Sequence, residues 1–281
     1  MNEVPADDGR DFVVPRAAGP NRLVRAGSPR YLAGDEDGHR EGASLRADGA
    51  GRAMKPWETV DRARAPDGTE LVLARREGEW VVRAAGRILM SSRTHGSEDA
   101  LAALALARVS RPRTVLLGGL GLGFTVRAAL DRLPPDSRAI VAELVPALVA
   151  WNRGPVADLA GRPLEDPRVR LQIGDVRARI AEARGAFDAI LLDVDNGPAA
   201  LAHAENDALY GNRGIRACRD ALRAGGVLAV WSAGPDAGYR ERLERAGLEV
   251  EEAAVPARGA GAGGVKHVVF LGVKGGGPRG R

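Results

Sequence analysis

The chain has 281 residues, of which 44% are hydrophobic and 4% aromatic, and its formal net charge is +4. This length and apolar content suffice for one substantial core and a small additional unit. The single cysteine, Cys218, excludes a disulfide or a cysteine-based metal site within one chain. No apolar run approaches the roughly 20 residues of a membrane-spanning helix, and the basic residues are dispersed rather than clustered. We therefore expect a cytoplasmic protein with no metal site and no membrane partner, and the dispersed basic residues leave a nucleic-acid partner only as a minor alternative.

The N-terminal part of the chain divides into two stretches. Residues 1–55 mix glycine, proline and charged residues without periodicity, which predicts a disordered leader. Residues 56–96 contain three short β-prone runs separated by glycine-bearing turns, and these predict a small antiparallel sheet from residues 70–76, 80–83 and 87–91. A helix is expected at residues 100–107, with Ser97 as its N-cap and the acids Glu98 and Asp99 in its first turn.

Residues 114–124, with the sequence TVLLGGLGLGF, organise the rest of the chain. The apolar run predicts a buried strand, the four glycines predict a tight turn, and residues 125–130 return to helical spacing. Gly119, Gly121 and Gly123 let the backbone approach a ligand closely, and the helix start beyond them suits an anionic or polar group. The unit predicts a nucleotide-like ligand, although a glycine loop alone also occurs as a plain tight turn.

The remainder alternates strands and helices. Strands are expected at residues 139–144, 169–173, 187–192 and 226–231, and helices at residues 146–151, 176–183 and 213–222, where Cys218 would pack as a small apolar group. Near-continuous apolar strands between helices predict a mostly parallel, Rossmann-like sheet that is covered on both faces and spans residues 97–274. Residues 248–253 and 266–273 have no helix between them and are expected to pair antiparallel at a sheet edge, before a frayed tail at 275–281.

Acidic residues follow three of these strands directly. Glu143, Asp175 and the pair Asp193 and Asp195 come at the carboxyl ends of successive strands, where open α/β sheets bind ligands. Glu143 lies where an acid accepts hydrogen bonds from ribose hydroxyls, and Asp175 is placed to accept from an adenine amine. Glu143 as a surface residue and Asp175 as a helix N-cap are the alternatives. Together the acids favour an adenosine-bearing cofactor.

Three phrases carry a family resemblance: LLDVDNGP at residues 191–198, LY at 209–210 and LRAGGVL at 222–228. With the order of motifs and the terminal strand pair, residues 70–273 resemble the spermidine synthase family. That family shares the seven-stranded sheet of class I S-adenosylmethionine (SAM) methyltransferases. The resemblance implies Glu143 at the ribose, Asp175 at the adenine and Gly119, Gly121 and Gly123 beneath the cofactor tail. It also implies Asp193 as the catalytic carboxylate, aided by Asp195.

Two departures from the family change the expected substrates. Leu122 stands where the family carries an acid that suits the amino end of decarboxylated SAM, so ordinary SAM is the favoured cofactor. In residues 91–99, Arg93 replaces an expected acid and only Glu98 matches, which argues against putrescine. By the resemblance, His95, Glu98 and Tyr210 are candidate substrate contacts. A polar turn residue at His95 and a core aromatic at Tyr210 are the alternatives.

The favoured hypothesis is a SAM-dependent transferase that moves a methyl or other alkyl group to a small amine-bearing acceptor. The main alternative is a genuine aminopropyltransferase that uses decarboxylated SAM and a diamine. Intramolecular SAM chemistry and a non-catalytic SAM-binding module remain open. By analogy with the family, a homodimer is expected.

Overall fold

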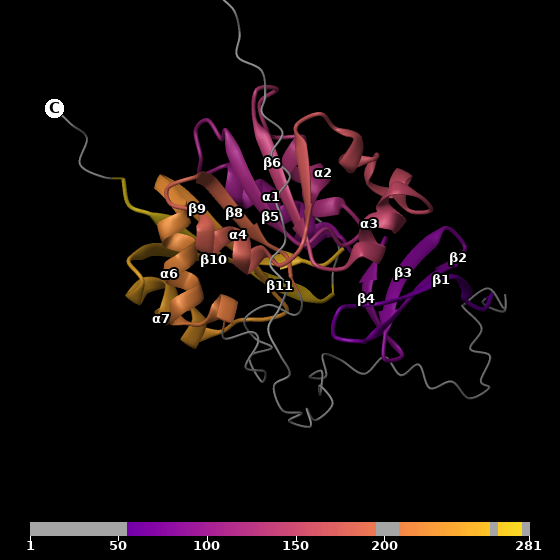
Figure 1. Ribbon diagram of the computed structural model, residues 1–281. Coiled ribbons are helices and arrows are strands. Elements are labelled where there is room, and N and C mark those ends of the chain that lie inside the picture. Colours follow the sequence, from indigo (N-terminus) through magenta and orange to yellow (C-terminus); the bar gives the residue numbers. More distant parts are fainter. Residues whose placement is uncertain (1–54, 195–207, 259–263, 277–281) are drawn as a thin grey trace, which may run out of the picture. The chain divides into compact units, whose positions relative to one another are not determined.

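The computed structural model describes residues 55–194, 208–258 and 264–276 (Figure 1). The predictions of a leader at 1–55 and of a frayed tail therefore lie almost entirely outside these residues, and Asp195 lies outside them as well. The described strands form two sheets. The first is antiparallel, in the order β1-β2-β3-β4, with strands β1 (Glu58–Arg64), β2 (Glu70–Arg76), β3 (Glu79–Ala84) and β4 (Arg87–Ser91).

The predicted small sheet is confirmed, but its first strand, β1, was not predicted from the sequence. Six of its seven residues are exposed, so it lacks the alternation of apolar and polar residues that marks a half-buried strand. It forms because β2 offers a free edge, to which it pairs antiparallel.

The second sheet has seven strands in the order β10-β11-β9-β8-β5-β6-β7. Its strands are β5 (Thr114–Gly118), β6 (Arg138–Glu143), β7 (Val169–Ile173), β8 (Phe187–Leu192), β9 (Leu222–Ser232), β10 (Leu248–Pro256) and β11 (Lys266–Lys274). Strands β5 to β9 are parallel, whereas β10 and β11 pair antiparallel with each other and β11 pairs antiparallel with β9. The predicted class I methyltransferase-like fold, with its terminal antiparallel pair, is confirmed.

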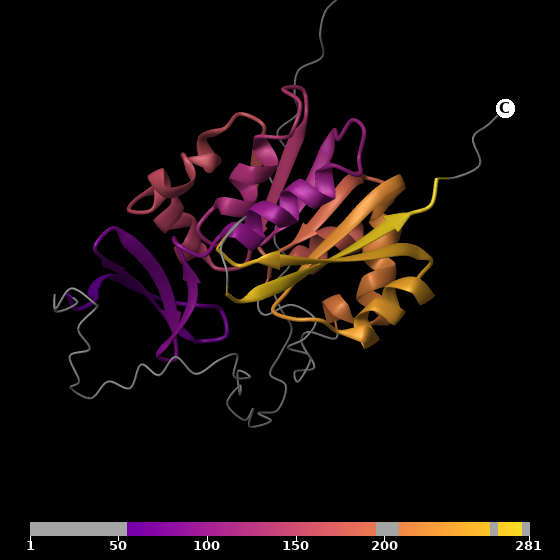
Figure 2. The same cartoon turned by 180° about the vertical axis from the view of Figure 1, so that it is seen from behind.

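Helices cover both faces of this sheet. They are α1 (Gly96–Leu106), α2 (Phe124–Leu130), α3 (Pro146–Arg153), α4 (Val176–Glu182), α6 (Asn212–Ala221) and α7 (Ala237–Arg245), with 3₁₀ turns η1 (Ala157–Ala160) and η2 (Pro163–Glu165). In Figure 1, helices α4, α6 and α7 lie in front of one face of the seven-stranded sheet and cover it. Figure 2 shows α1 and α2 against the opposite face.

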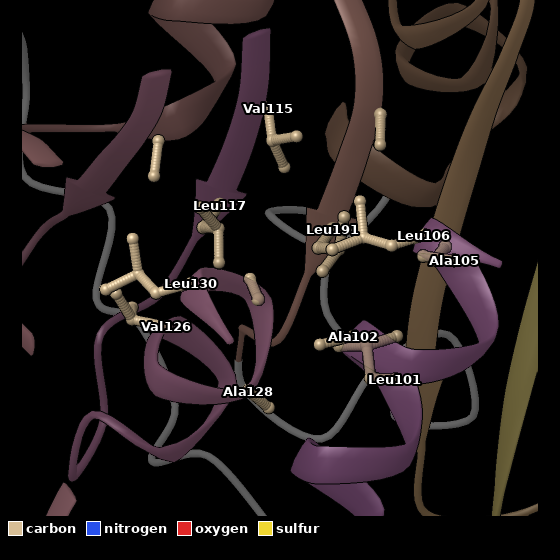
Figure 3. Close-up of a cluster of buried hydrophobic side chains, with 14 of the residues drawn as sticks. Leu101, Ala102, Ala105, Leu106, Val115, Leu117, Val126, Ala128, Leu130 and Leu191 are labelled. Carbon is tan, nitrogen blue, oxygen red and sulfur yellow. The ribbon is translucent and has the colours of Figure 1, made fainter. Parts of the chain in front are cut away.

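The alternation of side chains along each strand creates two apolar cores. On the α1 and α2 face, Val115, Leu117 and Leu191 of the central strands pack against Leu101 and Leu130 (Figure 3). Residues of the intervening positions, such as Leu116, Ile190 and Leu192, pack on the other face against α4, α6 and α7. Because neighbouring side chains of a strand point to opposite faces, near-continuous apolar strands are the pattern that a doubly covered sheet requires.

A third core joins the small sheet to the glycine turn and α3. Leu71, Leu73 and Val82 of the small sheet pack with Leu122, and with Leu148, Trp151 and Val156. The Trp151 indole Nε1–H also donates to Asp61 Oδ2 at 2.7 Å. The small sheet thus fixes the outer side of the glycine turn.

Two helix expectations differ from the structure. Helix α7 was not predicted, because only Tyr239 and Leu243 are buried among its residues, too few to give a periodic signal. Ser97 was predicted as the N-cap of α1, which is wrong: the cap position is His95, without a side-chain hydrogen bond, and Ser97 lies inside the first turn. Cys218 is buried as expected. None of the helices in the described ranges is long and apolar enough to cross a membrane.

Candidate active site

The glycine turn lies at the carboxyl ends of β5, β6 and β8. Gly119, Gly121 and Gly123 all have positive φ, at 91°, 53° and 89°. The Gly119 N–H donates to Ala142 O of β6, and the Asp193 N–H donates to Gly118 O, both at 2.9 Å. A Cβ at Gly119 would lie 2.2 Å from the backbone oxygen of Asp193, which is far inside contact distance. Glycine is therefore required here because the backbone that carries Asp193 lies against the turn.

Asn152 on α3 holds the other side of the turn. Its Nδ2 donates to Gly121 O at 2.8 Å and to Leu148 O at 2.9 Å, and the side chain is almost fully buried. A Cβ at Gly123 would lie 2.9 Å from its Oδ1. Asn152 was not predicted as a site residue from the sequence, although a buried asparagine on the inner face of a helix usually satisfies a specific backbone group.

Glu143 joins the end of β6 to the glycine turn. Only 4% of the residue is exposed. Its Oε2 accepts the Leu120 N–H and its Oε1 accepts the Val145 N–H, both at 2.7 Å. The two carboxylate oxygens thus fix the backbone at the start of the glycine turn and just after β6. The predicted contact with a ribose remains a prediction that this geometry permits.

Asp175 is the N-cap of α4, which is the alternative to adenine binding that the sequence offered for it. Its Oδ1 accepts the Arg177 N–H at 2.8 Å, and its Oδ2 lies 2.7 Å from Arg177 Nε. Partial burial by itself raises the pKa of Asp175, but the hydrogen bonds and charge of Arg177 outweigh burial and hold the pKa below its ordinary value. An ionised carboxylate at this strand end still accepts hydrogen bonds, and its role toward adenine stays a prediction.

Two apolar side chains at the same strand ends are unusually exposed. Leu144, directly after Glu143, is 50% exposed, and Ile173, the last residue of β7, is 59% exposed. The sequence analysis assigned neither of them to the site. Exposed aliphatic groups beside two acids offer an apolar surface to a flat ring.

Asp193 and Glu98 form the electrostatic centre of the site. Thr125 Oγ1 donates to Asp193 Oδ2 at 2.6 Å, and Ser97 Oγ donates to Glu98 Oε2 at 2.8 Å. Burial raises the pKa of the Asp193 carboxyl, against the lowering effect of the Thr125 hydrogen bond. Burial and the negative charge of Asp193 raise the pKa of Glu98 to about 8. Near neutral pH Glu98 therefore keeps its proton in the field of Asp193.

The remaining candidates lie around this pair. His95 precedes α1, stacks on the Phe124 ring with centroids 4.0 Å apart, and has its Nδ1 3.0 Å from Asp99 Oδ2. Tyr210 is 1% exposed, and its hydroxyl donates to Val194 O at 3.0 Å. Tyr210 is therefore a core aromatic whose hydroxyl holds the backbone at Val194, directly after Asp193. Direct substrate contacts of either residue remain predictions.

No family model matches the chain, but curated proteins do. It is 36% identical over 121 residues to a polyamine aminopropyltransferase of Nitrosomonas europaea, covering 42% of this chain and 35% of the relative. A polyamine aminopropyltransferase of Korarchaeum cryptofilum is 26% identical over 129 residues, covering 46% of this chain and 38% of the relative. Putrescine N-methyltransferase 4 of Nicotiana tabacum is 33% identical over 130 residues, covering 45% of this chain and 31% of the relative. The matched segment thus spans about a third of the length of these relatives.

Solved structures show the same fold over more of the chain. A spermidine synthase in complex with the transition-state analogue AdoDATO superposes with a TM-score of 0.66 at 18% identity, over 81% of this chain and 76% of that one. The spermidine synthase of Thermotoga maritima gives a TM-score of 0.64 at 18% identity, with the same coverage. The predicted resemblance to the spermidine synthase family is confirmed.

Proposed function

We propose that the protein is a transferase that moves an alkyl group from the sulfonium of a SAM-type donor to the nitrogen of a small amine. The observation that carries the proposal is the pair of buried carboxyl groups beside the glycine turn, Asp193 held by Thr125 and Glu98 held by Ser97, each with a raised pKa. Aminopropyl transfer from decarboxylated SAM is the favoured form, because two of the matched relatives are aminopropyltransferases.

The residues at the strand ends fit an adenosyl donor. Gly119 lets the turn pack against the backbone that carries Asp193, and the Glu143 carboxylate at the end of β6 would accept hydrogen bonds from ribose hydroxyls. Leu144 and Ile173 would flank the adenine, and Asp175 would accept from its amine. A positively charged sulfonium is favoured near Asp193, whose negative charge attracts it without a hydrogen bond.

When bound, the donor supplies a carbon whose bond to sulfur breaks as the amine nitrogen bonds to it. Only an unprotonated amine has the lone pair for this step, whereas a free alkylamine carries a proton at neutral pH. Asp193 and Glu98 attract the incoming ammonium and take one of its protons. Thr125 and Ser97 hold the two carboxyl groups by hydrogen bonds, so the acceptor nitrogen meets a fixed pair of oxygens.

Methyl transfer from ordinary SAM is the second candidate, and the glycine turn favours it. None of the residues from 118 to 123 is acidic, so the turn offers no partner for the free amino end of decarboxylated SAM. Leu122 itself points into the third core, against the small sheet. The start of α2 instead suits a carboxylate. A putrescine N-methyltransferase among the relatives is consistent with this candidate.

The two candidates differ in the product that the donor leaves. The full-length protein would be incubated with SAM or decarboxylated SAM and with putrescine or longer polyamines, and the products read by mass spectrometry. Methylthioadenosine with an aminopropylated amine supports the favoured form, and S-adenosylhomocysteine with a methylated amine supports the second. Asp193→Asn should lower kcat by about 10²–10⁴-fold, while Asp136→Asn, at an exposed ion pair, should not. Transfer by neither donor would reject the proposal.

We further propose, from the family resemblance alone, that the protein works in the cytoplasm and forms a homodimer. Analytical ultracentrifugation at micromolar concentration measures the second point, and a purely monomeric protein would contradict it.

A further inference from the structure

Ser97 connects the carboxyl pair to a second titratable side chain. The residue is 1% exposed in the first turn of α1. Its Oγ donates to Glu98 Oε2 at 2.8 Å and lies 2.9 Å from Nδ1 of His267. A hydroxyl that donates to one titratable group and accepts from another forms a continuous hydrogen-bonded chain from His267 to Glu98.

The antiparallel direction of β11 brings His267 to the site. Parallel strands β5, β8 and β9 end at the edge of the sheet that carries Asp193, and β11 begins there because it runs the opposite way. Val268 pairs with Ser232, the last residue of β9. The Gly96 N–H donates to Ala257 O at 2.9 Å and holds the start of α1 beside the same edge.

His267 is partly exposed and is held in a mostly apolar setting. The Trp231 indole of β9 packs edge-on at a centroid distance of 4.7 Å, and Val255 of β10 is its cross-strand partner. Burial lowers the pKa of the imidazole, so it is neutral at neutral pH. Its polar contact from α1 is Ser97, through which Glu98 is reached, and the neighbouring charged residue in the chain, Lys266, is exposed.

The chain of hydrogen bonds is complete in either direction. When Glu98 is ionised, His267 Nδ1–H donates to Ser97 Oγ, and the Ser97 hydroxyl donates to Glu98. When Glu98 carries a proton, its O–H donates to Ser97 Oγ, and the Ser97 hydroxyl donates to the bare His267 Nδ1. Reversal of both bonds delivers a proton from Glu98 to Nδ1, after which the imidazole loses its Nε2 proton to water.

We propose that Ser97 and His267 form a proton relay between the carboxyl pair of Glu98 and Asp193 and the solvent. Its part in catalysis rests on the function proposed above. An acceptor ammonium gives one proton to the pair, its nitrogen bonds the donor carbon, and the bond between that carbon and sulfur breaks with the electrons remaining on sulfur. The product ammonium keeps the other two protons of a primary amine nitrogen, so one proton per turnover leaves through Ser97 and His267. Ser97 and His267 are positioning and relay residues and do not touch the substrate.

The first test needs no substrate. The ring ¹⁵N shifts of His267 would be followed by NMR from pH 5 to 10 in the full-length protein. The relay predicts that these ¹⁵N shifts show an inflection near pH 8, where Glu98 titrates, in addition to the inflection from titration of the imidazole itself. Glu98→Gln and Ser97→Ala should each remove that inflection, whereas Ser137→Ala, which removes a remote buried hydroxyl, should keep it. Persistence of the inflection in Ser97→Ala, or its absence from the wild-type protein, would overturn the relay.

The second test is kinetic. Ser97→Ala and His267→Ala should each lower kcat roughly tenfold or more, with the KM for the amine within about twofold of wild type. Added imidazole should restore most of the activity of His267→Ala, and Ser97→Thr should retain it. Loss of amine binding without rescue would indicate a structural role and reject the relay in catalysis. Inactive wild-type protein would instead reject the proposed function and leave the NMR test to decide the relay.

Discussion

Replacement of Glu98 by glutamine should stabilise the free protein at alkaline pH. The pKa of Glu98 is raised from 4.5 to about 8, first because the carboxyl is buried and then because Asp193 is negatively charged. The unfolded chain loses this proton near pH 4.5, whereas the folded protein keeps it to about pH 8. Between those values the folded state binds more protons, so its free energy of unfolding falls as the pH rises.

The magnitude follows from the pKa difference. The step from 4.5 to about 8 corresponds to about 5 kcal/mol at 1.36 kcal/mol per pH unit. Glu98 is partly exposed and retains the Ser97 hydrogen bond, so water and the hydroxyl screen the charge and we expect about 2 kcal/mol. Glutamine preserves the shape and the acceptor oxygen but has no charge. Glu98→Gln should therefore raise the unfolding free energy by about 2 kcal/mol at pH 9, or about 4–8 °C in Tm, and by almost nothing at pH 5.

Thermal and urea unfolding at pH values from 5 to 9 measure this difference. Glu241→Gln is the matched control, because Glu241 lies on the surface in an ion pair with Arg245 and should show no such pH dependence. Wild-type stability that increases from pH 6 to 8.5 would refute the reasoning. A benefit of Glu98→Gln that is equal at pH 5 and pH 9 would also refute it, because the gain would then not come from the carboxylate charge.

Three further predictions concern the turn and the core. Gly119→Ala should cost about 3–5 kcal/mol in urea unfolding, because its Cβ meets the Asp193 backbone, whereas Gly78→Ala, with similar φ and open space, should cost about 1 kcal/mol; equal costs would contradict the clash. Glu143→Gln should cost about 1–3 kcal/mol in unfolding and weaken donor binding in calorimetry, because an amide oxygen replaces only one of two acceptors; unchanged values would contradict this. The Cys218 thiol, whose pKa burial raises to about 12, should react with a thiol reagent only after unfolding, and rapid labelling of the native protein would contradict this.

The elements predicted best were those whose signal is local. The apolar run of β5 and the tight glycine turn after it were both predicted, and Gly119 and Gly123 permit the positive φ that this turn adopts. The boundaries of β5 and β7 match the predicted runs closely. The exposed strand β1 was missed, since its pairing depends on the neighbouring strand rather than on its own residues.

The sequence also indicated the edge of the sheet at which the site lies. Parallel strands all end at one edge, so acids directly after apolar runs must gather there, and Glu143, Asp175 and Asp193 do. Their detailed surroundings were not predictable. Asp175 caps α4, and Glu143 binds two backbone N–H groups, because these contacts depend on turn geometry that only the folded backbone supplies.

Only the tertiary structure decided the protonation of the site. Glu98 and Asp193 belong to segments that are far apart in the chain, and Ser97 and His267 are 170 positions apart. In the sequence, each of these residues is an ordinary polar residue near the end of a helix or strand. Burial and the approach of a like charge change their proton affinities, and both effects arise from segments that the sheet brings together. The sequence by itself therefore determined the sheet and the acids at its edge, and folding determined that Asp193 meets Glu98 of α1 and that the pKa of both carboxyl groups is raised.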